Sequence, residues 1–134
     1  MVSILCFGAC FTWAVAFTYP DPPEVTEKAL SRHWIHAREE DRDGVHLYRA
    51  KGSFEPRPSR FRMEYDLQEQ GKCRYMWLSP SDGHRLKDGT WKLRAPAKPG
   101  DNPIIEVREG NETRAYAVIS LTKDTLRLKP EPQP

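Results

Sequence analysis

The chain has 134 residues, of which 38% are hydrophobic and 30% charged, and its formal net charge at pH 7 is +2. This composition is typical of one folded domain and excludes a disordered chain. The balanced charge provides no basic stripe of the kind that binds nucleic acid, so we expect no nucleic-acid partner. Three cysteines do not form a disulfide framework, and Cys73 is expected to be a buried, unreactive thiol.

The N-terminal part of the chain contains an uncharged apolar run, ILCFGACFTWAVAF. The run is short for crossing a bilayer, so we expect no integral membrane span. It resembles the hydrophobic part of a secretory signal, with Ala14 to Ala16 as a small-residue cleavage site. We therefore predict that residues 1–16 direct export to the periplasm or the medium. The alternatives are a buried first segment of a cytoplasmic protein and acylation at Cys10.

The rest of the chain reads as a linker followed by short extended runs. The composition of residues 17–29 predicts a linker with a short helical turn, which Pro23 would begin. Beyond it, alternating apolar and polar residues between Gly, Pro, Asn and Asp turns predict eight strands, at 32–38, 45–50, 59–67, 72–78, 90–95, 104–109, 113–121 and 125–129. Residues 79–89 are the longest predicted loop, and residues 130–134 are a predicted disordered tail.

Eight strands in sequence form either a closed barrel or a two-sheet sandwich. Closure removes exposed strand edges, and the short connections favour neighbouring strands over long crossings. We therefore predict an all-β fold: an eight-stranded antiparallel up-and-down barrel over residues 30–129.

This region resembles the lipocalin-like proteins of the calycin group, in particular small bacterial ones. The residues that carry the resemblance are Trp34, the GTW triplet at Gly89 to Trp91, and the closing run AVISLTKDTLRL. The resemblance implies an eight-stranded barrel in which a late Arg packs across a Trp and seals one end. The sealing pair would be Trp34 with Arg127, or with Arg114.

Two polar groupings contain residue types that are found in catalytic or metal sites. Ser79, Asp82 and His84 are the residue types of a catalytic triad, but their closeness in one loop is explained by turn chemistry. His33 and His36 lie three apart, which places them on opposite faces of a strand. With His46 and the acidic run EED they would make a surface zinc site, yet solvated strand ends explain them more simply, so no metal site is predicted.

The inward stripes of the predicted barrel carry the binding hypothesis. Small barrels either fill their interior or hold one small ligand, and the bulky lining here argues against a large cavity. Buried Tyr hydroxyls and Trp indole N–H groups need partners, which a polar ligand or a water would supply. The predicted pocket lining is Tyr65, Tyr75, Trp77, Trp91, Phe61, Met63 and Arg62, and the inward ring also includes Ile119.

The sequence therefore favours a non-enzymatic barrel that binds a small apolar or aromatic molecule in its interior, without a cofactor. The alternative is a solidly packed interaction or structural module that contacts a protein partner through its loops. An enzyme that uses the pocket is a third hypothesis.

Overall fold

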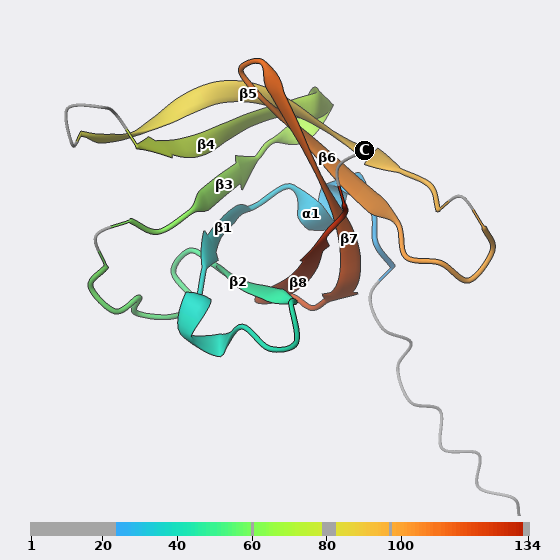
Figure 1. Ribbon diagram of the computed structural model, residues 1–134, viewed down its shortest axis with the longest axis horizontal. Coiled ribbons are helices and arrows are strands. Elements are labelled where there is room, and N and C mark those ends of the chain that lie inside the picture. The colour runs from blue at the N-terminus through green and yellow to red at the C-terminus, as the bar shows by residue number, and fades with distance from the viewer. Residues whose placement is uncertain (1–23, 60, 79–82, 97, 133–134) are drawn as a thin grey trace, which may run out of the picture.

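The structure, a computed structural model, describes residues 24–59, 61–78, 83–96 and 98–132 (Figure 1). The predicted export signal therefore lies outside the described residues. The elements in chain order are α1 (Glu27–Leu30), β1 (His33–His36), the 3₁₀ turn η1 (Arg38–Glu40), β2 (His46–Ala50), β3 (Glu64–Leu67), the 3₁₀ turn η2 (Glu69–Gly71), β4 (Lys72–Leu78), β5 (His84–Arg94), β6 (Ile104–Glu109), β7 (Glu112–Leu121) and β8 (Thr125–Pro130).

The eight strands form a closed barrel in the order β1-β2-β8-β7-β6-β5-β4-β3. Every neighbouring pair is antiparallel, so the strands alternate up and down around the barrel, as predicted. From β3 to β8 the spatial order follows the chain. β1 lies between β2 and β3, so the connection at 51–63 runs from one end of β1 to the other.

The predicted helical turn is α1, and Thr26 begins it by accepting a hydrogen bond at Oγ1 from the Ala29 backbone N–H, at 3.1 Å. α1 lies inside the outline of the ring of strands in Figure 1. Leu30 and Trp34 are both 0% exposed, and the Trp34 indole N–H donates to the Leu30 carbonyl at 2.9 Å. α1 therefore covers one end of the barrel, which we call the closed end.

Inward-facing side chains fill the barrel interior. The buried core includes Tyr48, Tyr65, Leu67, Cys73, Trp91, Ile105, Val107, Tyr116, Val118, Leu126 and Leu128. Cys73 is 2% exposed, and burial raises the pKa of its thiol to about 11, in keeping with the predicted unreactive cysteine. Gly89 of the GTW triplet allows β5 and β6 to approach closely, because a Cβ there would lie 2.5 Å from the Arg108 carbonyl oxygen.

Two predicted loop and strand boundaries are wrong. The strand predicted at 59–67 is only β3, because residues 61–63 form no ladder with β4. The long loop predicted at 79–89 is largely strand, because β5 begins at His84 and pairs with β4 from His84 to Thr90. β4 and β5 therefore extend together beyond the ring of the other strands (Figure 1).

Two smaller corrections concern the C-terminal hairpin. Ile119 is 39% exposed rather than inward-facing, because the β7–β8 register shifts between Val118 and Ser120 and leaves it unpaired. Pro130 belongs to β8, and the Glu131 backbone N–H donates to the Ala115 carbonyl, so the ordered barrel continues past residue 129. Residues 133–134 of the predicted tail lie outside the described part.

Candidate functional site at the open end of the barrel

The end of the barrel opposite α1 is where β1, β4, β6 and β8 finish and β2, β3, β5 and β7 begin. We call it the open end. The connection from His36 to His46, the short turn after Glu109 and the segment 61–63 that leads into β3 all lie there.

The interior of the barrel has no room for a ligand. Its void, lined by Trp34, Tyr48, Tyr65 and Tyr116 among others, has a volume of about 10 Å³. A single water needs about 10–15 Å³ by the same kind of measure. The predicted interior pocket is therefore filled by the rings that line it, as the bulky lining led us to expect.

The protein itself supplies partners for several buried polar groups. The Tyr65 and Tyr116 hydroxyl oxygens lie 2.8 Å apart, and the Trp91 indole N–H donates to the Gln68 carbonyl at 2.7 Å. No ligand is needed to satisfy these groups, contrary to one argument for the interior site. Burial also raises the pKa of the Tyr65 hydroxyl, which stays protonated.

A groove of about 520 Å³ lies at the open end instead. Its lining includes Phe61, Met63, Tyr75, Trp77, Lys87, Glu109 and Arg114. Larger hollows of about 660 and 720 Å³ lie over the outer surface near β6, β7 and the C-terminal residues, but no aromatic side chain lines them. The groove is therefore the hollow whose composition suits an organic ligand.

Trp77 is the half-exposed aromatic ring of this groove. The Lys87 ammonium lies 3.4 Å from the centre of the Trp77 ring, and the Arg85 guanidinium carbon lies 5.3 Å from it. Both cations come from β5, directly across the ladder from Tyr75 and Trp77. Among the described residues, neither the Lys87 ammonium nor the Arg85 guanidinium forms an ion pair with a carboxylate.

Glu109 forms the polar side of the groove. Its Oε1 lies 3.4 Å from the Tyr65 hydroxyl, and its Oε2 lies 2.7 Å from Arg114 Nε in an ion pair whose angle does not make a hydrogen bond. Burial raises the pKa of the Glu109 carboxyl, and this effect outweighs the opposing charge of Arg114. A buried carboxyl with an unsatisfied oxygen beside an aromatic hollow marks the groove as a candidate site.

The predicted pocket residues divide into three groups. Phe61, Met63, Tyr75 and Trp77 line the groove. Tyr65 and Trp91 belong to the filled core. Arg62 faces away from the groove, where its guanidinium binds the Glu39 carboxylate at 2.6 Å and the His36 carbonyl at 2.6 Å.

The predicted sealing pair is also corrected. Arg127 is exposed on β8, and Arg114 pairs with Glu109 at the open end. The guanidinium that lies over the Trp34 ring, at 5.8 Å, is that of Arg32. Arg32 directly precedes β1. A cation close to Trp34 in the sequence therefore covers its ring, in place of the Arg near the C-terminus that the resemblance implied.

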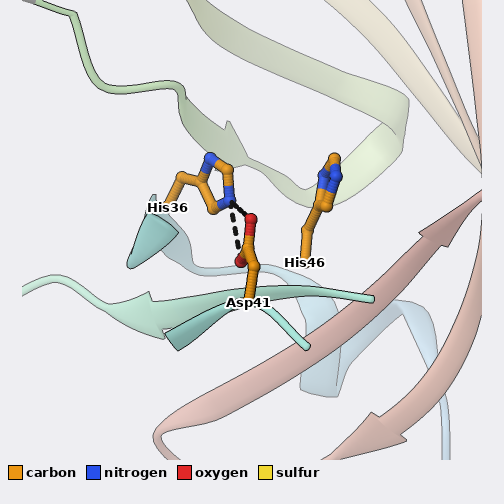
Figure 2. Close-up of side chains that lie close together, drawn as sticks. All are labelled: His36, Asp41 and His46. Atoms are coloured by element: carbon orange, nitrogen blue, oxygen red, sulfur yellow. Dashed lines mark hydrogen bonds and ion pairs between the residues drawn. The ribbon is translucent and has the colours of Figure 1, made fainter. Parts of the chain in front are cut away.

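The structure brings together three residues of the histidine-rich hairpin, as Figure 2 shows: His36, Asp41 and His46. His33 is on the opposite face and pairs with Glu64 at 2.6 Å. Burial lowers the pKa of His36 despite the hydrogen bond that its ring makes to the Asp41 carboxylate. Of the other grouping, Ser79 and Asp82 lie outside the described residues, and His84 contacts the Phe61 ring edge-on.

Sequence reasoning missed Glu109 and Tyr116 as neighbours of the open end, and it considered Arg114 only as a sealing residue. Tyr116 is two residues from Val118, so alternation places both side chains on the inward face of β7. The bulge at Ile119 shifts the alternation, and a prediction that placed Ile119 inward therefore placed Tyr116 outward. Lys87 was assigned to a loop, and only the β4–β5 register places it beside Trp77. No local pattern indicates that Glu109 is buried.

Comparisons of the chain with protein-family models, with curated proteins and with solved structures gave no match. The closed eight-stranded antiparallel barrel is compatible with a lipocalin-like fold. Among the described residues, no helix has the length and the apolar composition that crossing a membrane requires.

Proposed function

We propose that the protein is a non-enzymatic, lipocalin-like binding protein that holds a small aromatic molecule with an acidic group in its open-end groove. The observation that carries this proposal is the groove itself. Its volume of about 520 Å³ falls in the range of about 300–1,000 Å³ that is usual for small-molecule sites. Its lining combines apolar and aromatic side chains with a few charged ones, as such sites do.

The chemistry of the lining defines the ligand class. Phe61, Met63 and Trp77 offer an apolar surface on which an aromatic ring would be buried. Lys87 and Arg85 stand beside Trp77 without a carboxylate partner among the described residues, so an anionic group on the ligand would pair with them. Glu109 on the other side would disfavour a second anionic group.

The test uses two fluorescent probes of similar ring structure, anionic 8-anilinonaphthalene-1-sulfonate and neutral N-phenyl-1-naphthylamine. We expect both to bind and the anionic probe to bind more tightly. Trp77→Ala should weaken both probes by about fivefold, since an aromatic contact contributes about 1 kcal/mol. Lys87→Gln should weaken only the anionic probe, by a few-fold, because a partly exposed charge contributes up to about 1 kcal/mol.

Lys92→Gln is the matched control for the charge change. Lys92 lies on the same strand as Lys87, but its ammonium faces Glu106 on the outside of the barrel, at 3.2 Å. The control should leave the affinity of both probes unchanged. Equal effects of Lys87→Gln and Lys92→Gln, or unaltered binding in Trp77→Ala, would refute the groove as the binding site.

The filled interior favours a second function, that of a packed interaction module. A void of about 10 Å³ gives the barrel no lumen, so its loops would be the functional surface. Deleting residues 79–89 would not test this function, because residues 84–89 are part of β5 and the deletion would disrupt the barrel. Absence of saturable binding across a panel of small aromatic acids, with the fold intact by circular dichroism, would favour the module.

Export remains part of the proposal, supported by the apolar run at residues 4–17. Expression of the full chain, followed by cell fractionation and N-terminal sequencing, tests it. We expect the mature chain to begin near residue 17. An unprocessed chain in the cytoplasmic fraction would contradict export without affecting the groove.

A further inference from the structure

The β1–β2 hairpin places three metal-ligating side chains at the open end. His36 ends β1, His46 begins β2, and Asp41 lies in the connection between them. One ligand atom from each residue lies within 4.8 Å of the other two. In Figure 2 both imidazoles project to the same side of the hairpin, with the Asp41 carboxylate between them.

The backbone holds these residues in place. The connection ends in a two-residue turn, Asp43-Gly44, in which both residues have positive φ, at 53° and 76°. Such a turn matches the twist of the flanking strands and needs Asn, Asp or Gly. Arg42 and Val45 close it with reciprocal backbone hydrogen bonds of 3.2 and 2.8 Å, which returns the chain so that His46 lies near Asp41.

Hydrogen bonds hold the Asp41 carboxylate in its orientation. Its Oδ1 accepts a hydrogen bond from the Leu47 backbone N–H at 2.9 Å, and its Oδ2 lies 2.9 Å from His36 Nε2. The backbone hydrogen bond holds one carboxylate oxygen, and a cation at Oδ2 would replace the proton that Oδ2 shares with His36 Nε2. Partners of this kind orient ligands in metal sites.

Both imidazoles are oriented as well. The His36 and His46 rings stack with their centroids 5.1 Å apart and 29° between their planes. The Tyr48 ring stacks on His36 with a centroid distance of 4.8 Å. The three ligands are half-buried, so a metal ion would be shielded but reachable. Tetrahedral zinc with Zn–N distances of about 2.0–2.1 Å brings ligand atoms to about 3.3 Å from one another, which requires only a small rotation of the side chains.

We propose that His36, Asp41 and His46 bind one divalent transition-metal ion, with zinc as the natural occupant. Two imidazoles and one carboxylate are ligands that Zn²⁺ favours, and three protein ligands leave a fourth position open to water or to another molecule. The site is separate from the groove: none of its ligands lines the groove, and the proposal does not depend on the groove being occupied.

His33, on the same strand as His36, provides a matched control together with Glu64 on the neighbouring strand β3. Their side chains form a His–carboxylate pair at 2.6 Å, of similar exposure, but no second histidine belongs to it. A pair of this kind lacks the third ligand, so it should not bind the ion tightly. Comparing the two pairs separates metal ligation from the general effect of losing a histidine.

The experiment titrates Zn²⁺ into the full chain after treatment with EDTA, in a Cys6→Ser/Cys10→Ser background that removes competing thiols. Isothermal titration calorimetry should give one ion per chain. His46→Ala should lower the affinity by more than about 100-fold, beyond the 10–100-fold that follows loss of an outer partner. His33→Ala should leave the affinity unchanged.

A second measurement, by NMR, needs no substitution at the proposed ligands. In the NMR spectrum of the same protein, the imidazole signals of His36 and His46 should shift on addition of Zn²⁺, while those of His33 and His84 should not. Asp41→Asn, which keeps the side-chain shape, should weaken binding as well. Shifts at all four histidines, equal losses in His33→Ala and His46→Ala, or no saturable binding would overturn the proposal.

Discussion

The two ends of the barrel use the same kinds of residue for different purposes. At the closed end, Trp34 is fully buried, its indole N–H is satisfied by Leu30, and Arg32 covers its ring. At the open end, Trp77 is half-exposed beside Lys87 and lines a groove. An aromatic side chain on an inward stripe therefore becomes either core or binding surface, according to whether another element covers it.

The largest expected effect compares these two tryptophans. Trp34→Ala should lower the free energy of unfolding by about 3–5 kcal/mol, because it leaves a cavity in a filled core. Trp77→Ala should lower it by about 1 kcal/mol or less, because the ring is already partly in water. Urea denaturation followed by circular dichroism measures both. Similar losses in the two variants would remove the distinction between the ends.

The Tyr65–Tyr116 hydroxyl pair marks the boundary between core and groove. Tyr65→Phe should lower the free energy of unfolding by about 1–3 kcal/mol, because the buried Tyr116 hydroxyl loses its partner at 2.8 Å. The double variant Tyr65→Phe/Tyr116→Phe is the control, since removing both hydroxyls leaves neither unsatisfied. It should recover part of the loss in the same denaturation assay; an additive loss would contradict a direct pair.

Glu109 gives the open end a pH dependence. Its pKa in the folded state is raised above the ordinary value of 4.5, so the folded state holds the proton more tightly than the unfolded state does. This contribution to stability is fully present below about pH 4.5 and is lost as the pH rises through the raised pKa.

Glu109→Gln removes that titration. The difference in the free energy of unfolding, variant minus wild type, should therefore increase from pH 4 upward and then level off. Urea midpoints measured at a series of pH values give this difference directly. A difference that stays constant or decreases with pH would mean that the carboxyl is not protonated more readily in the fold.

The smallest effect concerns the contact between the 51–63 connection and η1. The Arg62 guanidinium donates hydrogen bonds to the Glu39 carboxylate and lowers its pKa to about 2. This interaction is present above about pH 4.5 and is lost as the pH falls through about 2. In a ¹³C NMR titration, Arg62→Gln should return the pKa of Glu39 toward 4.5. The pKa of Glu40, which Arg49 lowers, should stay low as an internal control.

Much of the fold was predictable from local pattern. β4 and β6 have the predicted limits, because unbroken alternation and clear turn residues bound them. β5 was predicted too short, since SDGHRLKDG has the composition of a loop and becomes strand only by pairing with β4. The position of β1 between β2 and β3 could not be predicted from the sequence either, because it depends on which edge strands pair when the sheet closes into a barrel.

The candidate sites were predictable in part. The apolar wall of the groove follows from strand parity, and four of the predicted residues line it. The buried Glu109 and the cations beside Trp77 come from separate hairpins, so no spacing in the chain relates them. For the histidines, parity correctly separates His33 from His36, whereas the approach of Asp41 to His46 depends on the turn at Asp43-Gly44.

Alternation along the chain was enough to predict an antiparallel barrel with aromatic rings toward its axis, because it sets which side chains share a face. Three features emerged from the folded barrel alone: the rings fill the interior, α1 closes one end, and charged side chains gather at the other. The reason is physical: period-two alternation acts within a strand, whereas void volume, covering and charge proximity depend on the distances between strands that are remote in the chain.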